Sequence, residues 1–278
     1  MQMRKSWSVG TISGIRVQIH WTLLALLAFV GWSEWQAGRA PLAGMGLYAG
    51  VFTCVLLHEF GHALAARRYG IGTRSITLWP FGGIAALDRI PSTPKQEFVV
   101  ALAGPAVNVV IAAALLPFVT FTDGWIATLL AINVMLVLFN LLPAFPMDGG
   151  RVLRAALATR MDPIRATRIA VKVGRVVAVG FVVAGVFWNP FLILIAWVVW
   201  TQGAAELRQL ESMRPVVLSP HDTLDRPLAI FARTGQHHFP VQDRSRMVGV
   251  LNREQLSLAF ARFGPQMTVG AVMEPVRS

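Results

Sequence analysis

The stretch that decides the fold is residues 42–66, LAGMGLYAGVFTCVLLHEFGHALAA. It is apolar and long enough to cross a bilayer as a helix, yet the run His58-Glu59-Phe60-Gly61-His62 lies near its end. Residues i and i+4 of a helix share a face, so the imidazoles of His58 and His62 can converge on one metal ion. Glu59 lies about 100° round the same turn, within reach of a water molecule beside that ion.

The residue types in this run point to zinc chemistry. Zinc lowers the pKa of a bound water to about 7, and a neighbouring carboxylate can take its proton and pass it to a leaving amine. The sequence therefore predicts a zinc hydrolase site with Glu59 as the general base. A chance occurrence of the motif is the alternative.

The composition places this site in a membrane. Of the 278 residues, 55% are hydrophobic and 14% are charged, and the mean hydropathy is +0.56. Soluble domains have about 25% charged residues. The net charge of +11 would suit nucleic acid, but Arg and Lys lie mainly between the apolar stretches, so no nucleic-acid partner is expected. Cys54 is the only cysteine, which excludes an internal disulfide.

Six apolar stretches predict an α-helical polytopic membrane protein with six transmembrane helices. The connections after the second and fourth stretches are rich in Arg and Lys, whereas the opposite set holds only Arg39. We therefore expect a multi-pass cell-membrane protein with both termini in the cytoplasm. No small-residue cleavage site follows the first stretch, so a retained helix is expected rather than a signal peptide. The stretches are residues 19–35, 42–66, 97–119, 125–142, 169–187 and 190–205.

A third zinc ligand must come from elsewhere in the chain, because catalytic zinc commonly has three protein ligands plus water. The first candidate is Asp148 in the segment 140–150, NLLPAFPMDGG. Its prolines break the helix at membrane depth, which is tolerated only beside a cavity or inside protein, and its glycines let the backbone bend closely. An Asp-Gly turn leaving the membrane is the alternative.

Cys54 is a rival for the third ligand, since it lies on the same helix face four residues before His58. However, eight residues separate Cys54 from His62, about 12 Å along the axis, whereas donors on one zinc lie within about 4 Å of each other. One helix cannot easily supply all three ligands. We therefore expect Cys54 to be a packed apolar side chain.

Three motifs in order along the chain resemble the site-2 protease family of intramembrane zinc metalloproteases, peptidase family M50. They are the run 58–62, the segment 140–149, and residues 103–108, AGPAVN, and the resemblance covers roughly residues 17–210. The branch that it resembles is that of the bacterial sporulation-factor protease, which carries a C-terminal CBS motif.

The resemblance implies a role for each site residue. His58, His62 and Asp148 would bind one Zn²⁺ per chain, and Glu59 would be the catalytic base. Asn140 and Asn108 would contribute to substrate binding: Asn140 would help hold substrate or the transition-state oxyanion, and Asn108 would lie near the site. Taken alone, either asparagine could instead make a helix–helix hydrogen bond.

The function implied is cleavage of transmembrane segments of single-span, membrane-tethered proteins within the lipid bilayer. The alternatives from other classes are a zinc-binding membrane transporter and a regulatory scaffold. Residues 73–87 carry β-formers on both sides of a Pro/Gly turn, which predicts a short β-hairpin near the site. An edge strand there could bind an unwound substrate as an added strand, and an interfacial loop is the alternative.

The composition changes after Leu210, so we expect a transmembrane protease domain at 1–211 and a small α/β domain at 212–278. The latter resembles a CBS motif, and residues 268–275 resemble the start of a second. CBS motifs work in pairs and often bind adenine nucleotides, so either the sequence is truncated or two chains pair as a homodimer. The family's nucleotide contacts would fall on Asn252 and Gln255, a departure that speaks against nucleotide binding. The strands and helices are expected at 216–218, 228–233, 238–241, 248–251 and 253–262.

Overall fold

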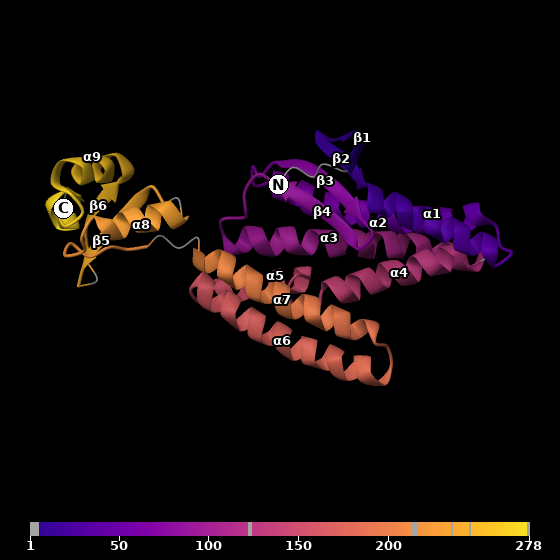
Figure 1. Ribbon diagram of the computed structural model, residues 1–278. Coiled ribbons are helices and arrows are strands. Elements are labelled where there is room, and N and C mark those ends of the chain that lie inside the picture. Colours follow the sequence, from indigo (N-terminus) through magenta and orange to yellow (C-terminus); the bar gives the residue numbers. More distant parts are fainter. Residues whose placement is uncertain (1–5, 122–123, 213–215, 235, 245, 277–278) are drawn as a thin grey trace. The chain divides into compact units, whose positions relative to one another are not determined.

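The computed structural model describes residues 6–121, 124–212, 216–234, 236–244 and 246–276. By its internal contacts the chain divides into two units, Met1–Leu207 and Arg208–Ser278, and the boundary falls inside the last long helix of the first unit. The helices of this part of the chain, shown in Figure 1, are α1 (Trp21–Gln36), α2 (Pro41–Arg67), α3 (Pro94–Leu115), the 3-10 turn η1 (Leu116–Phe121), α4 (Trp125–Asn140), α5 (Asp148–Ala158), α6 (Pro163–Phe187) and α7 (Phe191–Ser212).

Four of these helices are long and apolar enough to cross a membrane by length and composition. They are α2, α3 with its extension to Thr120, α6, and α7 to Glu211. The sequence predicted six spans, but α1 and α4 have 16 residues each. At 1.5 Å per residue, 16 residues extend about 24 Å, less than the roughly 30 Å of a hydrocarbon core. The chain is thus a mainly helical membrane protein with four clear candidate spans.

A four-stranded sheet accompanies the helices, in the order β1-β2-β3-β4. Its strands are β1 (Ser6–Ile12), β2 (Ile15–His20), β3 (Thr73–Trp79) and β4 (Gly82–Leu87). The predicted hairpin at 73–87 is confirmed, since β3 and β4 pair antiparallel from Thr73↔Leu87 to Trp79↔Gly82. The sequence analysis missed β1 and β2, which form a second hairpin joined to the first by the parallel pair β2 and β3.

The sheet lies near α2 (Figure 1), and its buried residues pack against the turn of α2 that carries the HExxH run. Ile15, Val17 and Ile76 are buried from the sheet side, and Phe60 and Ala63 are buried from α2. Phe60 belongs to the run itself, so its burial turns the opposite side of that turn, with His58 and His62, away from the sheet core.

Helices α2 and α3 approach each other closely at a glycine of the run. A Cβ atom at Gly61 would lie 2.7 Å from the carbonyl oxygen of Ala103, and real Cβ atoms do not come so near. Glycine therefore permits the close packing of these two helices. The contact brings the second motif, which begins at Ala103, directly against the first.

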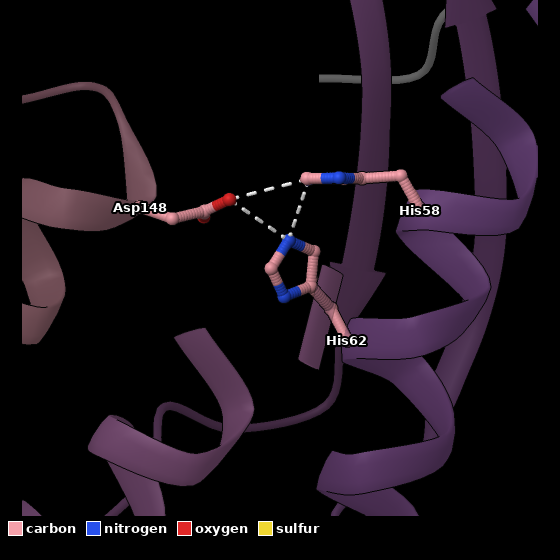
Figure 2. A group of neighbouring side chains, drawn as sticks. All are labelled: His58, His62 and Asp148. Carbon is pink, nitrogen blue, oxygen red and sulfur yellow. Dashed lines mark hydrogen bonds and ion pairs between the residues drawn. The ribbon is translucent and has the colours of Figure 1, made fainter. Parts of the chain in front are cut away.

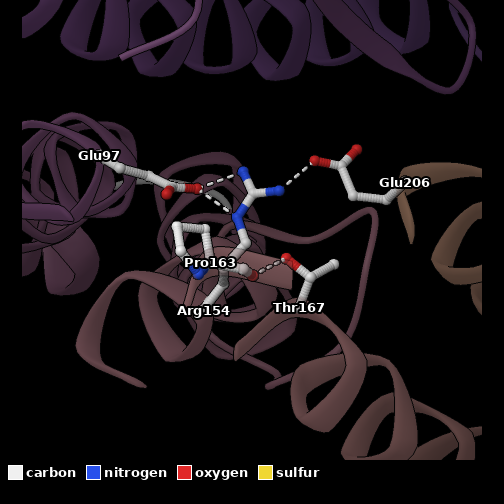
Figure 3. A network of polar contacts seen from close by, with 5 residues as sticks. All are labelled: Glu97, Arg154, Pro163, Thr167 and Glu206. Atoms are coloured by element: carbon white, nitrogen blue, oxygen red, sulfur yellow. Dashed lines mark hydrogen bonds and ion pairs between the residues drawn. The ribbon is translucent and has the colours of Figure 1, made fainter. Parts of the chain in front are cut away.

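Helix α5 is anchored through a buried arginine, shown in Figure 3. Arg154 is 6% exposed. Its Nε donates to Oε1 of Glu97 in α3 at 2.7 Å, and its guanidinium also pairs with Glu206 in α7. The guanidinium lies 5.3 Å from the ring centre of Phe145. A buried charge is tolerated only with partners, so these contacts fix how α5 sits between α3 and α7. Asp148, at the start of α5, is fixed with it.

The second unit is a small α/β fold. Its sheet has the order β5-β6-β7, and its core contains Leu218, Leu224, Phe239, Val241, Leu251, Leu256 and Val269. The expected strands and helices at 228–233, 238–241, 248–251 and 253–262 are confirmed, whereas 216–218 contributes a single bridge from Leu218 to Val241. The elements are α8 (Asp225–Thr234), β5 (His238–Asp243), β6 (Arg246–Asn252), α9 (Arg253–Phe263), the 3-10 turn η2 (Val269–Ala271) and β7 (Glu274–Pro275).

Candidate metal centre

Three donor atoms from two helices meet at one point, as Figure 2 shows. The Nε2 atoms of His58 and His62 lie 3.0 Å apart, and each lies 3.2 Å from Oδ2 of Asp148. Both histidines come from one face of α2, and Asp148 is the first residue of α5. Within the described residues these three form the group of His, Cys, Asp and Glu side chains suited to hold a metal ion.

The spacing of this triangle fits zinc. In a tetrahedral site with zinc bonds of about 2.0–2.1 Å, neighbouring donors are about 3.3 Å apart. The observed separations of 3.0–3.2 Å are close to that value. Oδ2 of Asp148 is buried and finds no hydrogen-bond donor among the described residues. A buried carboxylate oxygen without a donor is costly, and a cation between the three atoms would satisfy it.

A glycine keeps the space beside the two histidines open. A Cβ atom at Gly104 of α3 would lie 2.3 Å from Nε2 of His62 and 2.6 Å from Nε2 of His58. A side chain at this position would therefore collide with both donor atoms. The residues present thus fit a zinc ion in their spacing, in their chemistry and in the room left for it.

The hydrogen bond of Nδ1 of His62 shows which ring nitrogen carries the lone pair that could bind a metal. Nδ1 of His62 lies 2.7 Å from the carbonyl oxygen of Val100. A carbonyl oxygen can only accept a hydrogen bond, so Nδ1 carries the proton and donates it. In a neutral imidazole the lone pair is then on Nε2, the atom that faces the metal position.

His58 is held in the same way by a side chain. Nδ1 of His58 lies 2.5 Å from Oδ1 of Asn108, and Nδ2 of Asn108 donates to Oδ1 of Asn133 at 2.8 Å. Asn108 and Asn133 are both 0% exposed. Because its two polar atoms are engaged inside the protein, Asn108 has the geometry of a residue that orients His58. Its hydrogen bond to Asn133 joins α3 to α4, which is the alternative considered for this residue, and the expected substrate contact stays a prediction.

Glu59 lies at the tip of the β3–β4 hairpin. A Cβ atom at Gly83 of β4 would lie 2.5 Å from Cγ of Glu59 and 3.2 Å from its Oε1. The half-buried Glu59 side chain therefore lies against the hairpin, and Glu59 follows the metal-site residue His58 directly in α2. The hairpin reaches the site as the sequence predicted.

Asn140 is the last residue of α4, and the chain turns back sharply after it. A Cβ atom at Gly149 would lie 2.3 Å from the carbonyl oxygen of Leu141, so the end of α4 and the start of α5 are packed against each other. This places Asn140 beside the loop that delivers Asp148. Glycine at 149 is what the tight return requires.

Cys54 and Asn133 are two further buried residues near the metal position. Cys54 is buried and lies outside the metal group, and its Sγ accepts a hydrogen bond from Nδ2 of Asn133 at 3.3 Å. It is a packed side chain, as expected. The sequence analysis missed Asn133, although an amide in the middle of the apolar helix WIATLLAINVMLVLFN is a signal that could have found it.

The fold and the site define a class: a helical membrane protein in which an HExxH helix and a separate aspartate form a metal centre of the zinc hydrolase type. Residues 46–128 and 124–181 match the model of peptidase family M50. The chain is also 32% identical over 271 residues to a zinc metalloprotease of Methanocaldococcus jannaschii, covering 90% of this chain and 78% of that protein. It belongs to peptidase family M50, as its motifs predicted.

Two other similarities extend this result. The solved structure of a site-2 protease from Methanocaldococcus jannaschii matches 73% of this chain and 95% of that chain, with a TM-score of 0.56 and 34% identity. Rip3 of Mycobacterium tuberculosis is 34% identical over an alignment of 242 residues, which covers 76% of this chain. The chain spans 61% of the length of Rip3.

Proposed function

We propose that this protein is an intramembrane zinc metalloendopeptidase that cleaves transmembrane segments of membrane-tethered proteins. The observation that carries the proposal is the convergence of His58, His62 and Asp148 on one point, with Glu59 next to His58 in the same helix. Membership of peptidase family M50 and similarity to a solved site-2 protease support it. The transporter and scaffold alternatives have no comparable observation in their favour.

Each residue has a defined task in the proposed reaction. His58, His62 and Asp148 hold the zinc ion, which when bound supplies a Lewis acid and lowers the pKa of water to about 7. Glu59 takes a proton from the attacking water and delivers it to the leaving amine. Its position next in sequence to His58 keeps its carboxylate within one helical turn of the metal position. We assign to Asn140 the role of holding the substrate carbonyl as negative charge develops on it.

A substrate helix must be opened before it can be cut, because its backbone N–H and C=O groups are already paired. The sheet order places β4 at an edge, and Gly83 of β4 lies against Glu59. An unwound segment that adds to this edge as a further strand would have its backbone satisfied while it lies beside the catalytic base. We therefore propose that β4 binds the substrate as its neighbouring strand.

The proposed membrane topology keeps six transmembrane helices in a multi-pass protein with both termini in the cytoplasm. Helices α1 and α4 would cross with local thinning of the bilayer, since a hydrophobic mismatch of a few ångströms costs only fractions of a kcal/mol per ångström. The support for this orientation is the charge pattern: five arginines between 151 and 168 stand against a single Arg39 on the opposite side.

For residues 212–278 we propose a CBS-like α/β module. Asn252 and Gln255, the positions at which the family contacts a nucleotide, form a capping box at the start of α9. Each side-chain oxygen accepts the other residue's backbone N–H, at 2.9 and 3.0 Å. Their evident role is to begin the helix. Adenine-nucleotide binding is therefore not part of the proposal. Pairing into a homodimer stays a prediction from the resemblance.

The test is the substitution Glu59→Gln in protein reconstituted with a single-span substrate. We expect about one zinc per chain to be retained and cleavage to fall by about 100-fold or more, because the general base is lost while the ligands stay. Glu254→Gln, at an exposed position of α9, is the matched control and should cleave normally. Cleavage at the normal rate by Glu59→Gln would reject the protease mechanism, and a folded wild type without zinc would indicate a scaffold.

A further inference from the structure

Asn133 is a buried amide in a place where apolar side chains are expected. It lies in the middle of α4, and its neighbours Val134 and Met135 are 43% and 59% exposed, on faces turned away from the protein. Asn133 itself is 0% exposed. Burial of an amide without partners costs at least about 1–3 kcal/mol, so its retention points to specific contacts.

The contacts of Asn133 have a fixed direction. Its Nδ2 donates to the carbonyl oxygen of Leu129 at 2.8 Å and to Sγ of Cys54 at 3.3 Å. Because the Leu129 carbonyl can only accept, the NH₂ end of Asn133 must face it. The opposite end, Oδ1, then faces α3, where it accepts the hydrogen bond from Nδ2 of Asn108.

The orientation of the Asn133 amide determines the orientation of Asn108 at the metal site. With its NH₂ end donating to Asn133, Asn108 must present Oδ1 to His58, and Nδ1 of His58 must donate. If the Asn108 amide were turned over, its NH₂ group would face Nδ1. The neutral imidazole would then carry its proton on Nε2, where the metal ligand is needed.

We propose that Asn133 is a positioning residue that acts through Asn108 to keep His58 in the tautomer whose Nε2 can bind zinc. This inference rests on the metal site of the proposed function. His62 needs no such relay, because the backbone carbonyl of Val100 fixes its tautomer directly. The dependence on Asn133 is therefore specific to one of the two histidines.

The first variant is Asn133→Leu, which keeps the approximate size of the side chain and removes both the NH₂ group and the oxygen of the Asn133 amide. The affinity for zinc, measured by competition with a chelator, should fall about 10- to 100-fold, as for other losses of the groups that orient a metal ligand. Thr128→Val is the matched control, since Thr128 lies in the same helix, is exposed, and donates its hydroxyl hydrogen to the carbonyl oxygen of Gly124, the residue that caps that helix. It should bind zinc like the wild type.

The decisive variant is the rescue. In Asn108→Asp the two carboxylate oxygens both accept, so the group cannot present a donor to His58 whichever way it turns. The double variant Asn133→Leu with Asn108→Asp should therefore bind zinc within about 3-fold of Asn108→Asp alone. If Asn133 only packs α3 against α4, the additional Asn108→Asp change would not restore the affinity for zinc.

The outcomes separate the inference from the function on which it rests. Unchanged zinc affinity in folded Asn133→Leu, or failure of Asn108→Asp to rescue it, would overturn the relay while the metal site stands. A wild type that binds no zinc would overturn the metal site itself. Should Asn133→Leu fail to fold, ¹⁵N spectra of the metal-free wild type give the answer: His58 should be protonated on Nδ1, and protonation on Nε2 would contradict the proposal.

Discussion

Replacing Gly104 with alanine is expected to remove the zinc site while leaving the fold largely in place. The new methyl group would lie 2.3 Å from Nε2 of His62 and 2.6 Å from Nε2 of His58, whereas ordinary contact begins near 3.4 Å. Each imidazole would have to retreat by about 1 Å. Helix α3 cannot move away instead, because it packs against α2, α4 and α5.

The size of the effect follows from the narrow range of zinc bonds. Their lengths vary by about 0.2 Å, so displacements of about 1 Å exceed the tolerance several-fold and both histidines cannot remain ligands. We expect the affinity for zinc to fall by at least about 100-fold, equivalent to about 2.7 kcal/mol. Cleavage should be lost in the same proportion at limiting zinc.

The assay is chelator competition on the purified protein, with the thermal unfolding of the metal-free form measured alongside. Gly180→Ala in α6 is the control, since a Cβ atom there would meet nothing within 4 Å. The reasoning would be refuted if Gly104→Ala bound zinc as tightly as the control. That result would mean that the triangle of donors is not where zinc binds.

Two further predictions concern the anchoring of α5 and the edge of the sheet. Arg154→Met should destabilise the protein by about 3–5 kcal/mol in thermal or denaturant unfolding, because Glu97 and Glu206 lose their buried partner; unfolding at the wild-type midpoint would show that the ion pairs contribute little. Neighbouring residues of a strand direct their N–H groups to opposite sides, so of Ile84 and Ala85 in the edge strand β4 one N–H points toward β3 and the other points away from the sheet. Proline at the residue whose N–H points away from the sheet should fold, keep zinc and lose cleavage. Normal cleavage by the folded variant would rule out strand addition at this edge.

The HExxH part of the site could be predicted from the sequence because its geometry is local, whereas the meeting of Asp148 with it was expected from the resemblance of the three motifs to a known family. The spacing of His58 and His62 on one helix fixes their common face, and the glycines after Asp148 signal a tight return of the chain. The hairpin at 73–87 was likewise visible in its β-formers and its turn. These features depend on residues that are close together in the sequence, so they can be recognised in one sequence.

The second hairpin was missed although its signal is present. Ile15, Val17 and Ile19 alternate with polar residues, which is the pattern of a half-buried strand. Ser13 and Gly14 have φ angles of 52° and 80°, the left-handed conformation that a two-residue hairpin turn requires. An apolar helix begins directly afterwards, and its strong hydropathy led to a predicted helix that started two residues too early, at 19 instead of Trp21.

The remaining differences arise from packing that no local pattern specifies. The predicted spans included the apolar residues 116–119 and 141–142, but the structure places them in a 3-10 turn and in the return loop. The part played by Asn108 becomes visible only when α3 lies between α2 and α4. Its partner Asn133 is 25 residues away in sequence, so spacing alone could not connect the two.

The measurement that tests the central claim most directly is the position of the cut. Purified protein in liposomes is given a single-span substrate, and the products are identified by mass spectrometry, with Glu59→Gln and chelator-treated protein in parallel. We predict a cut inside the transmembrane segment that is absent in both parallels and returns when zinc is restored. A cut confined to residues outside the membrane, or an equal cut by Glu59→Gln, would contradict the account.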